Sequence, residues 1–396
     1  MLCTHRVMEC VAASGQYEVH ALCMRFRGEQ EYEYVNGVHV HRFRPSFWTR
    51  LRNENGGRQE RARLDRLMEL IQKFLTIPVF PLLRPLTASR LLRRAVKLHK
   101  RESFGIVVSE HHELDTLLAG CRLKRRFDGL KHIAVLWDPV QGQIATVHLP
   151  GRFTARRIAR VESFSSRYST LLISMESIRD YFRDNGDISA DHRRFLGVPG
   201  IIKPEPEVPT EHMDLLREGF INIVFSGWLS VSQRNPLPVI ELLNQCDNAE
   251  KINIVFFSMG ADDGLREAAK SFRGTIVCHD YISLKELHTI YRHADYLLNV
   301  SHINANMVPS KIFEYMSYGK PVISTYVTDG DSAQKFLSRY SEGLCIDLKA
   351  QAETNVASLN SFLSAAHRSV PFDEVQRLFA ENSPEAYLSV INEMAS

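Results

Sequence analysis

The feature that most constrains the fold is a regular alternation of apolar and amphipathic segments in residues 221–348. Apolar runs occur at 221–228, 251–260, 274–282, 295–301 and 343–348. Helical patterns separate these runs, and Ser283 and Glu286 have the spacing of a capping box at the start of one helix. Alternating strands and helices predict a parallel sheet that is covered by helices on both faces.

The N-terminal half repeats this pattern less regularly. Strand-like runs occur at 17–25, 35–43, 104–110, 131–138 and 167–174, and a helix-like segment that ends at Gly15 precedes them. The chain becomes rich in proline at 200–209, which is typical of a linker. We therefore predict an α/β protein with two Rossmann-like domains, residues 1–203 and 204–396.

Composition agrees with two globular domains and gives a first indication of location. The chain has 396 residues, of which 44% are hydrophobic, so each domain has enough apolar residues for a core. The seven cysteines are scattered without a C-x-x-C pair, which predicts reduced thiols in a cytoplasmic protein. The sequence has neither the ~20-residue apolar run of a transmembrane helix nor a recognisable signal peptide.

Charge is distributed unevenly along the chain. Residues 1–203 contain 34 Lys and Arg against 21 Asp and Glu, a net charge of +13, whereas the remainder carries −10. An insertion at about 46–100 adds a basic amphipathic stretch interrupted by three prolines. This stretch either lies in an anionic membrane interface or packs on the domain with its arginines in water. We expect no nucleic-acid partner, since no recognised nucleic-acid module is present.

Residues 306–325, NMVPSKIFEYMSYGKPVIST, combine several groups that suit a nucleotide. Pro309 favours the first turn of a helix, where free N–H groups attract anions, and Ser310 and Lys311 add a hydroxyl and a positive charge. Glu314 lies on the same helix face and can accept two ribose hydroxyl groups. The spacing also fits an ordinary helix in which Lys311 and Glu314 pair with each other.

The segment PSKIFEYMSYGKPVIST, with the upstream block YISLKELHTIYRHADYLLNVS, resembles the nucleotide-sugar region of GT-B glycosyltransferases. The resemblance is to the family-four branch, glycosyl transferases group 1, and extends over residues 221–348. It implies a C-terminal domain that binds a nucleotide sugar and an N-terminal domain that binds the acceptor, with reaction in the cleft.

The resemblance also assigns roles to single residues. It implies that Glu314 holds the ribose hydroxyls and that Ser310 and Lys311 contact the diphosphate of a UDP or GDP sugar. The residues that match its other nucleotide and donor-sugar positions are Gly227, Tyr281, Ile282, Asn306, Met307 and Val308.

Several features of the sequence depart from the family pattern. Asn306 stands where the family often has a glutamate, and Trp228 stands where it has an arginine after the first strand's glycine. Arg234 is close enough in sequence to supply the missing positive charge near the diphosphate. The N-terminal domain begins with a helix, so we expect it to lack the first strand of the family.

Candidates for acceptor chemistry lie in the first half. Asp138 ends the strand-like run 131–138, and His111 follows the run 104–110, so either side chain is placed to act as a base. Asp138 before Pro139 is also a common turn arrangement, and a loop histidine is often merely exposed. Since positive charge at Lys311 and Arg234 suits the leaving group, we expect neither a metal nor a cofactor.

Together these observations predict a metal-independent hexosyltransferase that uses a nucleoside diphosphate sugar. Its acceptor would be a lipid-linked or surface-polysaccharide glycan of the cell envelope, and the protein would lie in the cytoplasm at the inner face of the membrane. Two alternatives stay open: a non-catalytic nucleotide-sugar-binding module and a GT-B nucleotide-sugar epimerase.

Overall fold

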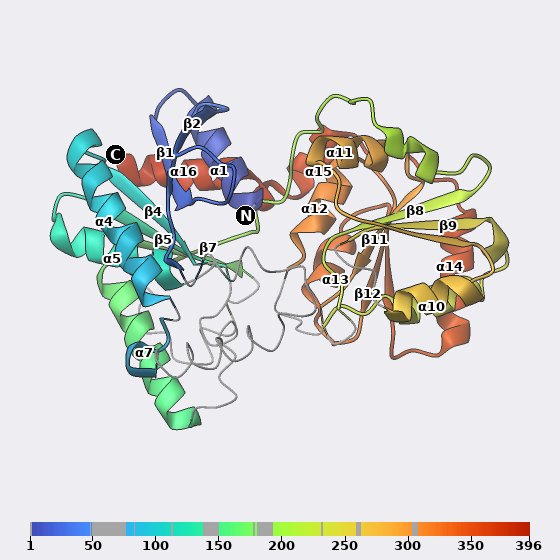
Figure 1. The fold of residues 1–396 in the computed structure, drawn as a ribbon. Coiled ribbons are helices and arrows are strands. Elements are labelled where there is room, and N and C mark those ends of the chain that lie inside the picture. The colour runs from blue at the N-terminus through green and yellow to red at the C-terminus, as the bar shows by residue number, and fades with distance from the viewer. Residues whose placement is uncertain are drawn as a thin grey trace. The chain divides into compact units, whose positions relative to one another are not determined.

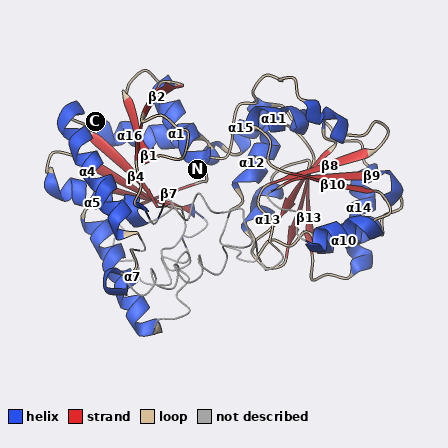
Figure 2. Ribbon diagram, in the orientation of Figure 1, coloured by secondary structure: helices blue, strands red, loops and turns tan. Residues whose placement is uncertain are grey.

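The computed structural model describes residues 2–47, 49, 77–82, 84–111, 114–137, 150–176, 179, 193–230, 233–258, 263–302 and 308–396. The chain forms two compact α/β units (Figures 1 and 2). The N-terminal unit comprises residues 1–197 and 385–396, and the C-terminal unit comprises residues 198–384.

The N-terminal unit contains two separate sheets within its described residues. Its elements are α1 (Leu2–Ala13), β1 (Val19–Met24), β2 (Tyr32–Val35), β3 (Val38–Phe43), a 3-10 turn (Ile77–Val79), α4 (Pro85–Glu102), β4 (Ile106–His111), α5 (Leu114–Arg126), β5 (Lys131–Leu136), α7 (Gly151–Arg167), β6 (Leu171–Met175), β7 (Arg193–Leu196) and α16 (Pro384–Ala395). One sheet has the order β1-β3-β2, with β2 antiparallel, and the other is parallel in the order β4-β5-β6-β7. Among the described residues no strand joins β1 to β4, and the first described element is the helix α1.

Apolar burial explains why the predicted strands of this unit form. In β5, Ile133, Ala134, Val135 and Leu136 are all at most 4% exposed, as expected of a strand that is covered on both faces. Helix α5 packs on β4 and β5, and α4 and α7 pack beside it (Figure 1).

The C-terminal unit is built on one parallel sheet with the order β10-β9-β8-β11-β12-β13. Its elements are a 3-10 turn (Glu211–Leu215), β8 (Ile221–Ser226), α9 (Leu237–Asn244), a 3-10 turn (Ala249–Lys251), β9 (Ile252–Phe257), α10 (Asp263–Ser271), β10 (Thr275–His279), α11 (Leu284–His293), β11 (Tyr296–Val300), α12 (Ser310–Ser317), β12 (Val322–Tyr326), α13 (Ser332–Leu337), β13 (Gly343–Asp347), α14 (Ala352–Ser364), α15 (Phe372–Leu378) and a final 3-10 turn (Ala380–Asn382).

Helices cover both faces of this sheet (Figure 2). Residues of α9, α10 and α14 form one hydrophobic core with the strands, and α12 and α13 contact β11, β12 and β13. The capping box that the sequence predicts is present, since the Ser283 side chain accepts from the Glu286 N–H and the Glu286 carboxylate accepts from the Ser283 N–H. The five predicted strands of residues 221–348 are also present.

The boundary between the units differs from the predicted division at 203/204. It lies between Gly197 and Val198, and the end of the chain belongs to the N-terminal unit rather than to the second domain. The cause is long-range contact of α16, because the Tyr387 hydroxyl donates to the Gly197 carbonyl at 2.9 Å and Tyr17 donates to Asn392 Oδ1 at 2.7 Å. No local pattern in the sequence predicts these contacts of α16.

The proline-rich stretch at 200–209 is not a free linker. The Ile202 N–H donates to Ser317 Oγ at 3.1 Å, and the Val208 N–H donates to Thr289 Oγ1 at 3.0 Å. These bonds fasten the stretch to α12 and α11, so it is part of the C-terminal unit.

Candidate functional site

The topology of the C-terminal sheet defines where a ligand site is expected. The chain order reverses at β8, because β9 lies on one side of it and β11 on the other. Loops that leave the carboxyl ends of two such strands diverge and open a crevice between them. Gly227 follows β8, and the segment after β11 leads to Ser310 at the start of α12.

Lys311 and Glu314 form an ion pair at the start of α12. The Lys311 ammonium donates to Glu314 Oε1 at 2.7 Å. The Glu314 side chain is only 2% exposed, whereas that of Lys311 is 22% exposed. The mutual pairing that the sequence left open as an alternative is therefore present, and it balances the charge of a buried carboxylate.

Tyr291 connects this ion pair to the end of β8. Its hydroxyl accepts from Lys311 Nζ at 3.1 Å and shares a hydrogen bond with Ser226 Oγ. The Ser226 N–H donates to the Tyr315 hydroxyl at 3.2 Å. Burial raises the pKa of Tyr291 well above its usual value, and Tyr315 and Glu314 raise it further. Tyr291 therefore stays neutral and positions Lys311 by hydrogen bonding.

Arg234 and Gly227 lie beside each other after β8. Gly227 has φ 144°, a conformation that strains any other residue, and its N–H donates to the Phe257 carbonyl at 3.1 Å. A Cβ placed on Gly227 would lie 3.8 Å from Arg234 Nη1. Burial lowers the pKa of Arg234, and its Nε has no hydrogen-bond partner among the described residues. An arginine is charged even so, and this one suits an anionic ligand.

The other residues that are predicted to bind the nucleotide differ in their exposure to solvent. Ser310 is the half-buried first residue of α12, and Pro309 before it provides no side-chain cap for the helix N–H groups. Tyr281 is 49% exposed after β10 and interacts electrostatically with Arg234, while Ile282 beside it is half-buried.

Several predicted residues cannot be placed in the site. Asn306 and Met307 lie outside the described residues, and Val308 is half-buried two positions before Ser310. Asp138 also lies outside them. His111 ends β4 in the N-terminal unit, where it pairs in register with Leu136. Their roles in donor or acceptor binding stay predictions.

Sequence reasoning missed Tyr291 and His288, which both come from α11. His288 is 2% exposed, and its Nε2 lies 3.5 Å from Glu314 Oε1. The available signal was their spacing: residues three apart on a helix share one face, and α11 is the helix with the capping box. Their proximity to α12 depends on packing that the sequence pattern does not report.

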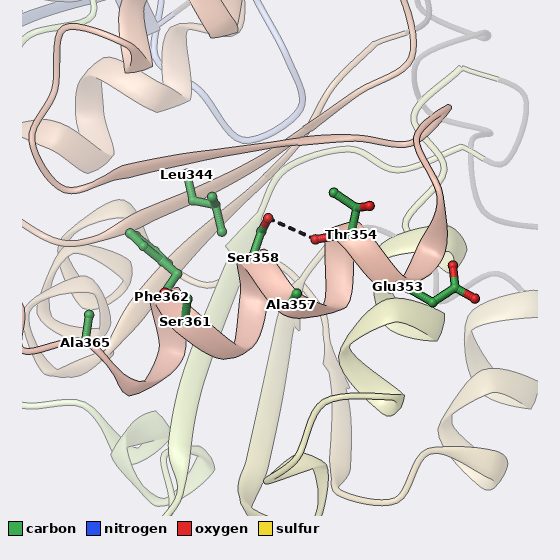
Figure 3. Close-up of a pocket in the computed structure, with 8 residues that line it drawn as sticks. All are labelled: Leu344, Glu353, Thr354, Ala357, Ser358, Ser361, Phe362 and Ala365. Atoms are coloured by element: carbon green, nitrogen blue, oxygen red, sulfur yellow. Dashed lines mark hydrogen bonds between the residues drawn. The ribbon is translucent and has the colours of Figure 1, made fainter.

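A surface hollow in the same unit has a different character. It has a volume of about 830 Å³ and follows α14 (Figure 3). Its lining residues are Leu344, Glu353, Thr354, Ala357, Ser358, Ser361, Phe362 and Ala365. The Ser358 hydroxyl donates to the Thr354 carbonyl at 2.9 Å within the helix. The hollow contains none of the predicted site residues and no cluster of reactive groups.

Among the described residues, no helix combines the length and apolar character needed to cross a bilayer.

Comparisons with known proteins agree with the sequence resemblance. Residues 221–359 match the family model of glycosyl transferases group 1. Comparison with curated protein sequences gives no significant match.

Solved structures resemble the chain over nearly its whole length. Sucrose-phosphate synthase from Thermosynechococcus elongatus has 12% identity and a TM-score of 0.64, covering 100% of this chain and 92% of that one. A structure titled trehalose-6-phosphate from E. coli bound with UDP-2-fluoro glucose has 14% identity and a TM-score of 0.66, covering 97% and 94%. WaaG, a glycosyltransferase involved in lipopolysaccharide biosynthesis, has 12% identity and a TM-score of 0.57, covering 98% and 95%.

At these identities the structural matches establish the fold, and the family model identifies the C-terminal segment. The chain therefore has a GT-B fold, and within it residues 221–359 match the model of glycosyl transferases group 1.

Proposed function

We propose that the protein transfers a hexose from a UDP or GDP sugar to a lipid-linked or surface-polysaccharide acceptor. The observation that carries this proposal is the grouping of Arg234, Lys311 and Glu314 at the switch point of the C-terminal sheet. Lys311 pairs with Glu314, and Arg234 lies beside Gly227 and interacts electrostatically with Tyr315 of α12, so the region holds two cations and one carboxylate and favours an anionic ligand. The similar structure bound with UDP-2-fluoro glucose supports a nucleotide sugar as that ligand.

The contacts of Lys311 leave it able to bind a phosphate. An ammonium has three N–H donors, and Lys311 uses one on Glu314 and one on Tyr291. The third can donate to the diphosphate while the ion pair stays closed. Arg234 adds a second charge, and the N–H groups at the start of α12 add dipolar attraction.

These groups can stabilise the leaving group, which is the contribution that glycosyl transfer most requires. As the sugar's anomeric bond to the diphosphate breaks, negative charge grows on the leaving oxygen, and Lys311 and Arg234 stabilise it. This assignment needs no metal ion. The acceptor hydroxyl must also lose a proton, and we propose Asp138 or His111 of the N-terminal unit for that role.

Binding and product release test the proposal. Full-length protein is titrated calorimetrically with UDP and GDP, then incubated with UDP-glucose or GDP-mannose and a membrane-lipid extract. We expect one diphosphate to bind and its release from the sugar to require the extract, also in the presence of EDTA. Failure to bind either diphosphate would overturn the proposal, whereas binding without release or transfer would favour a non-catalytic module.

We further propose that the protein works in the cytoplasm, at the anionic inner face of the cell membrane. Helix α4 buries Thr87, Ala88, Leu91 and Leu98 within its unit, so these apolar groups are not available for insertion into lipid. The exposed basic residues of α4 are Arg90, Arg93, Lys97, Lys100 and Arg101. Those of α7 are Arg152, Arg156, Arg160 and Arg167. Contact would therefore be electrostatic and sensitive to salt.

A flotation assay tests the membrane proposal. We expect recovery with vesicles containing phosphatidylserine, and little recovery with neutral vesicles or in high salt. The variant R156E/R160E should float less well, with exposed Glu353→Lys in the C-terminal unit as a control. Equal recovery on neutral vesicles would contradict the electrostatic mechanism.

A further inference from the structure

Three ligating side chains meet on the small sheet of the N-terminal unit. Strands β1 and β3 are parallel and place His20 directly opposite His39. Glu18 precedes His20 by two residues, so it projects from the same face. The two imidazole rings stack with their centroids 4.6 Å apart and their planes inclined by 14°. We call Glu18, His20 and His39 the His–Glu cluster.

We propose that the His–Glu cluster is a binding site for a divalent transition-metal ion such as Zn²⁺. Glu18 Oε1 lies 3.0 Å from His20 Nε2 and 3.6 Å from His39 Nε2, and the three ligand atoms lie within 4.8 Å of one another. In a tetrahedral zinc site, bonds of about 2.0–2.1 Å place ligand atoms about 3.4 Å apart. These two separations lie on either side of that value, and the two stacked rings must also rotate away from their near-parallel arrangement for both Nε2 atoms to reach one ion.

Neighbouring groups orient the imidazoles in the manner of a metal site. His20 Nδ1 lies 3.1 Å from His41 Nε2, and His39 Nδ1 lies 2.8 Å from the Tyr32 hydroxyl. If both rings carry their proton on Nδ1 and donate it to these partners, each Nε2 keeps its lone pair available for the ion. Hydrogen bonds of this kind typically fix the ligand rings of metal sites.

The ligand types determine which ions the site accepts. Two imidazoles and one carboxylate suit Zn²⁺, Ni²⁺, Cu²⁺ or Co²⁺ and are a poor match for Mg²⁺ or Ca²⁺, which prefer oxygen ligands. Three protein ligands leave a fourth position for water. Arg94 and Arg101 of α4 act electrostatically on neighbouring His41 and would limit the affinity, but Arg101 is paired with Glu102.

The His–Glu cluster differs in location and chemistry from the candidate nucleotide site of the C-terminal unit. It lies in the N-terminal unit and involves none of the residues proposed for glycosyl transfer. The sequence predicted no metal site, because its ligands come from two strands and contain no cysteine. An ion held by His20 and His39 would connect β1 to β3 and stabilise the small sheet.

Metal titration of the full-length, EDTA-treated protein tests the proposal. We expect one equivalent of Zn²⁺ to bind by calorimetry, the thermal midpoint to rise, and Co²⁺ to give the visible bands of a tetrahedral complex. H39Q and E18Q should each weaken Zn²⁺ binding at least tenfold, whereas H5Q, at an exposed histidine of α1, should not.

E18Q keeps the test decisive even if a histidine variant unfolds. The Glu18 side chain is 70% exposed, so the substitution removes the ligand charge without disturbing the core. Absence of one-equivalent Zn²⁺ binding, or equal affinity in the wild type and a folded E18Q variant, would overturn the proposal.

Discussion

The ribose role that we predict for Glu314 can be tested with the variant Glu314→Gln. The substitution keeps the side-chain volume and removes the charge. Hydrogen bonds to charged groups contribute about 1.5–3 kcal/mol each. Glutamine keeps one acceptor oxygen, so we expect the loss of about one such bond, equivalent to a roughly ten- to hundredfold weaker nucleoside diphosphate.

The contacts of Glu314 in the free protein complicate a simple affinity measurement. Its carboxylate is 2% exposed and paired with Lys311 at 2.7 Å, so the variant releases Lys311 from its partner. A freed ammonium binds phosphate more strongly and would hide part of the ribose loss. The ribose contribution must therefore be isolated with a second change, made in the ligand.

A cycle with the 2′,3′-dideoxy nucleotide isolates that contribution. Calorimetry should show that the wild type binds the dideoxy diphosphate roughly ten- to hundredfold more weakly than the ribonucleotide. The variant should distinguish the two ligands less strongly than the wild type does, because glutamine keeps only one of the two acceptor oxygens. Glu342→Gln is the matched control, since Glu342 is also buried and pairs with His367 at 2.6 Å, outside the candidate site. Equal discrimination by wild type and Glu314→Gln would refute the ribose role.

Three other substitutions or modifications test the remaining contacts. Lys311→Met should weaken diphosphate binding at least tenfold while leaving nucleoside binding unchanged, and should lower the free energy of unfolding by about 2 kcal/mol, because it removes a charged hydrogen-bond partner of a buried carboxylate; equal losses for both ligands in calorimetry would contradict a phosphate role. Gly319→Ala should destabilise the protein by more than about 1 kcal/mol in urea unfolding, since Gly319 has φ 66° and an added Cβ would lie 2.3 Å from the Val370 carbonyl oxygen; an unchanged midpoint would contradict this. Burial raises the pKa of Cys121 to about 12, so iodoacetamide at pH 8 should modify the exposed Cys23 first and Cys121 only after unfolding, as mass spectrometry would show.

The C-terminal fold could be predicted well because its signals are local. Each strand from β8 to β13 except β12 corresponds to a predicted apolar run, and the capping box at Ser283 is complete. Strand β12 corresponds to the β-branched run at the end of the segment that carries Glu314. In the N-terminal unit the short strand β2 was missed, because all four of its residues are exposed and leave no apolar pattern.

Within the candidate site, the sequence could predict the shared helix face of Lys311 and Glu314, while their roles in binding stay predictions. Lys311 and Glu314 are three residues apart on α12, so their shared face follows from helical periodicity. Tyr291 and Arg234 come from α11 and the loop after β8, and their approach to α12 depends on tertiary packing. Periodicity therefore identified the phosphate and ribose candidates but not the groups that position them.

The net charge of the candidate nucleotide site in the C-terminal unit gives a physical reason to expect that this site prefers a diphosphate to an uncharged ligand. Arg234 and Lys311 each carry one positive charge, Glu314 carries one negative charge, and Tyr291 stays neutral because burial raises its pKa. A net positive charge in a largely buried setting is costly when the site is empty, and a phosphate oxygen relieves that cost. A neutral sugar cannot do so. We therefore expect these residues to bind a nucleotide sugar mainly through its leaving group, so that the choice of sugar comes from other residues of the chain.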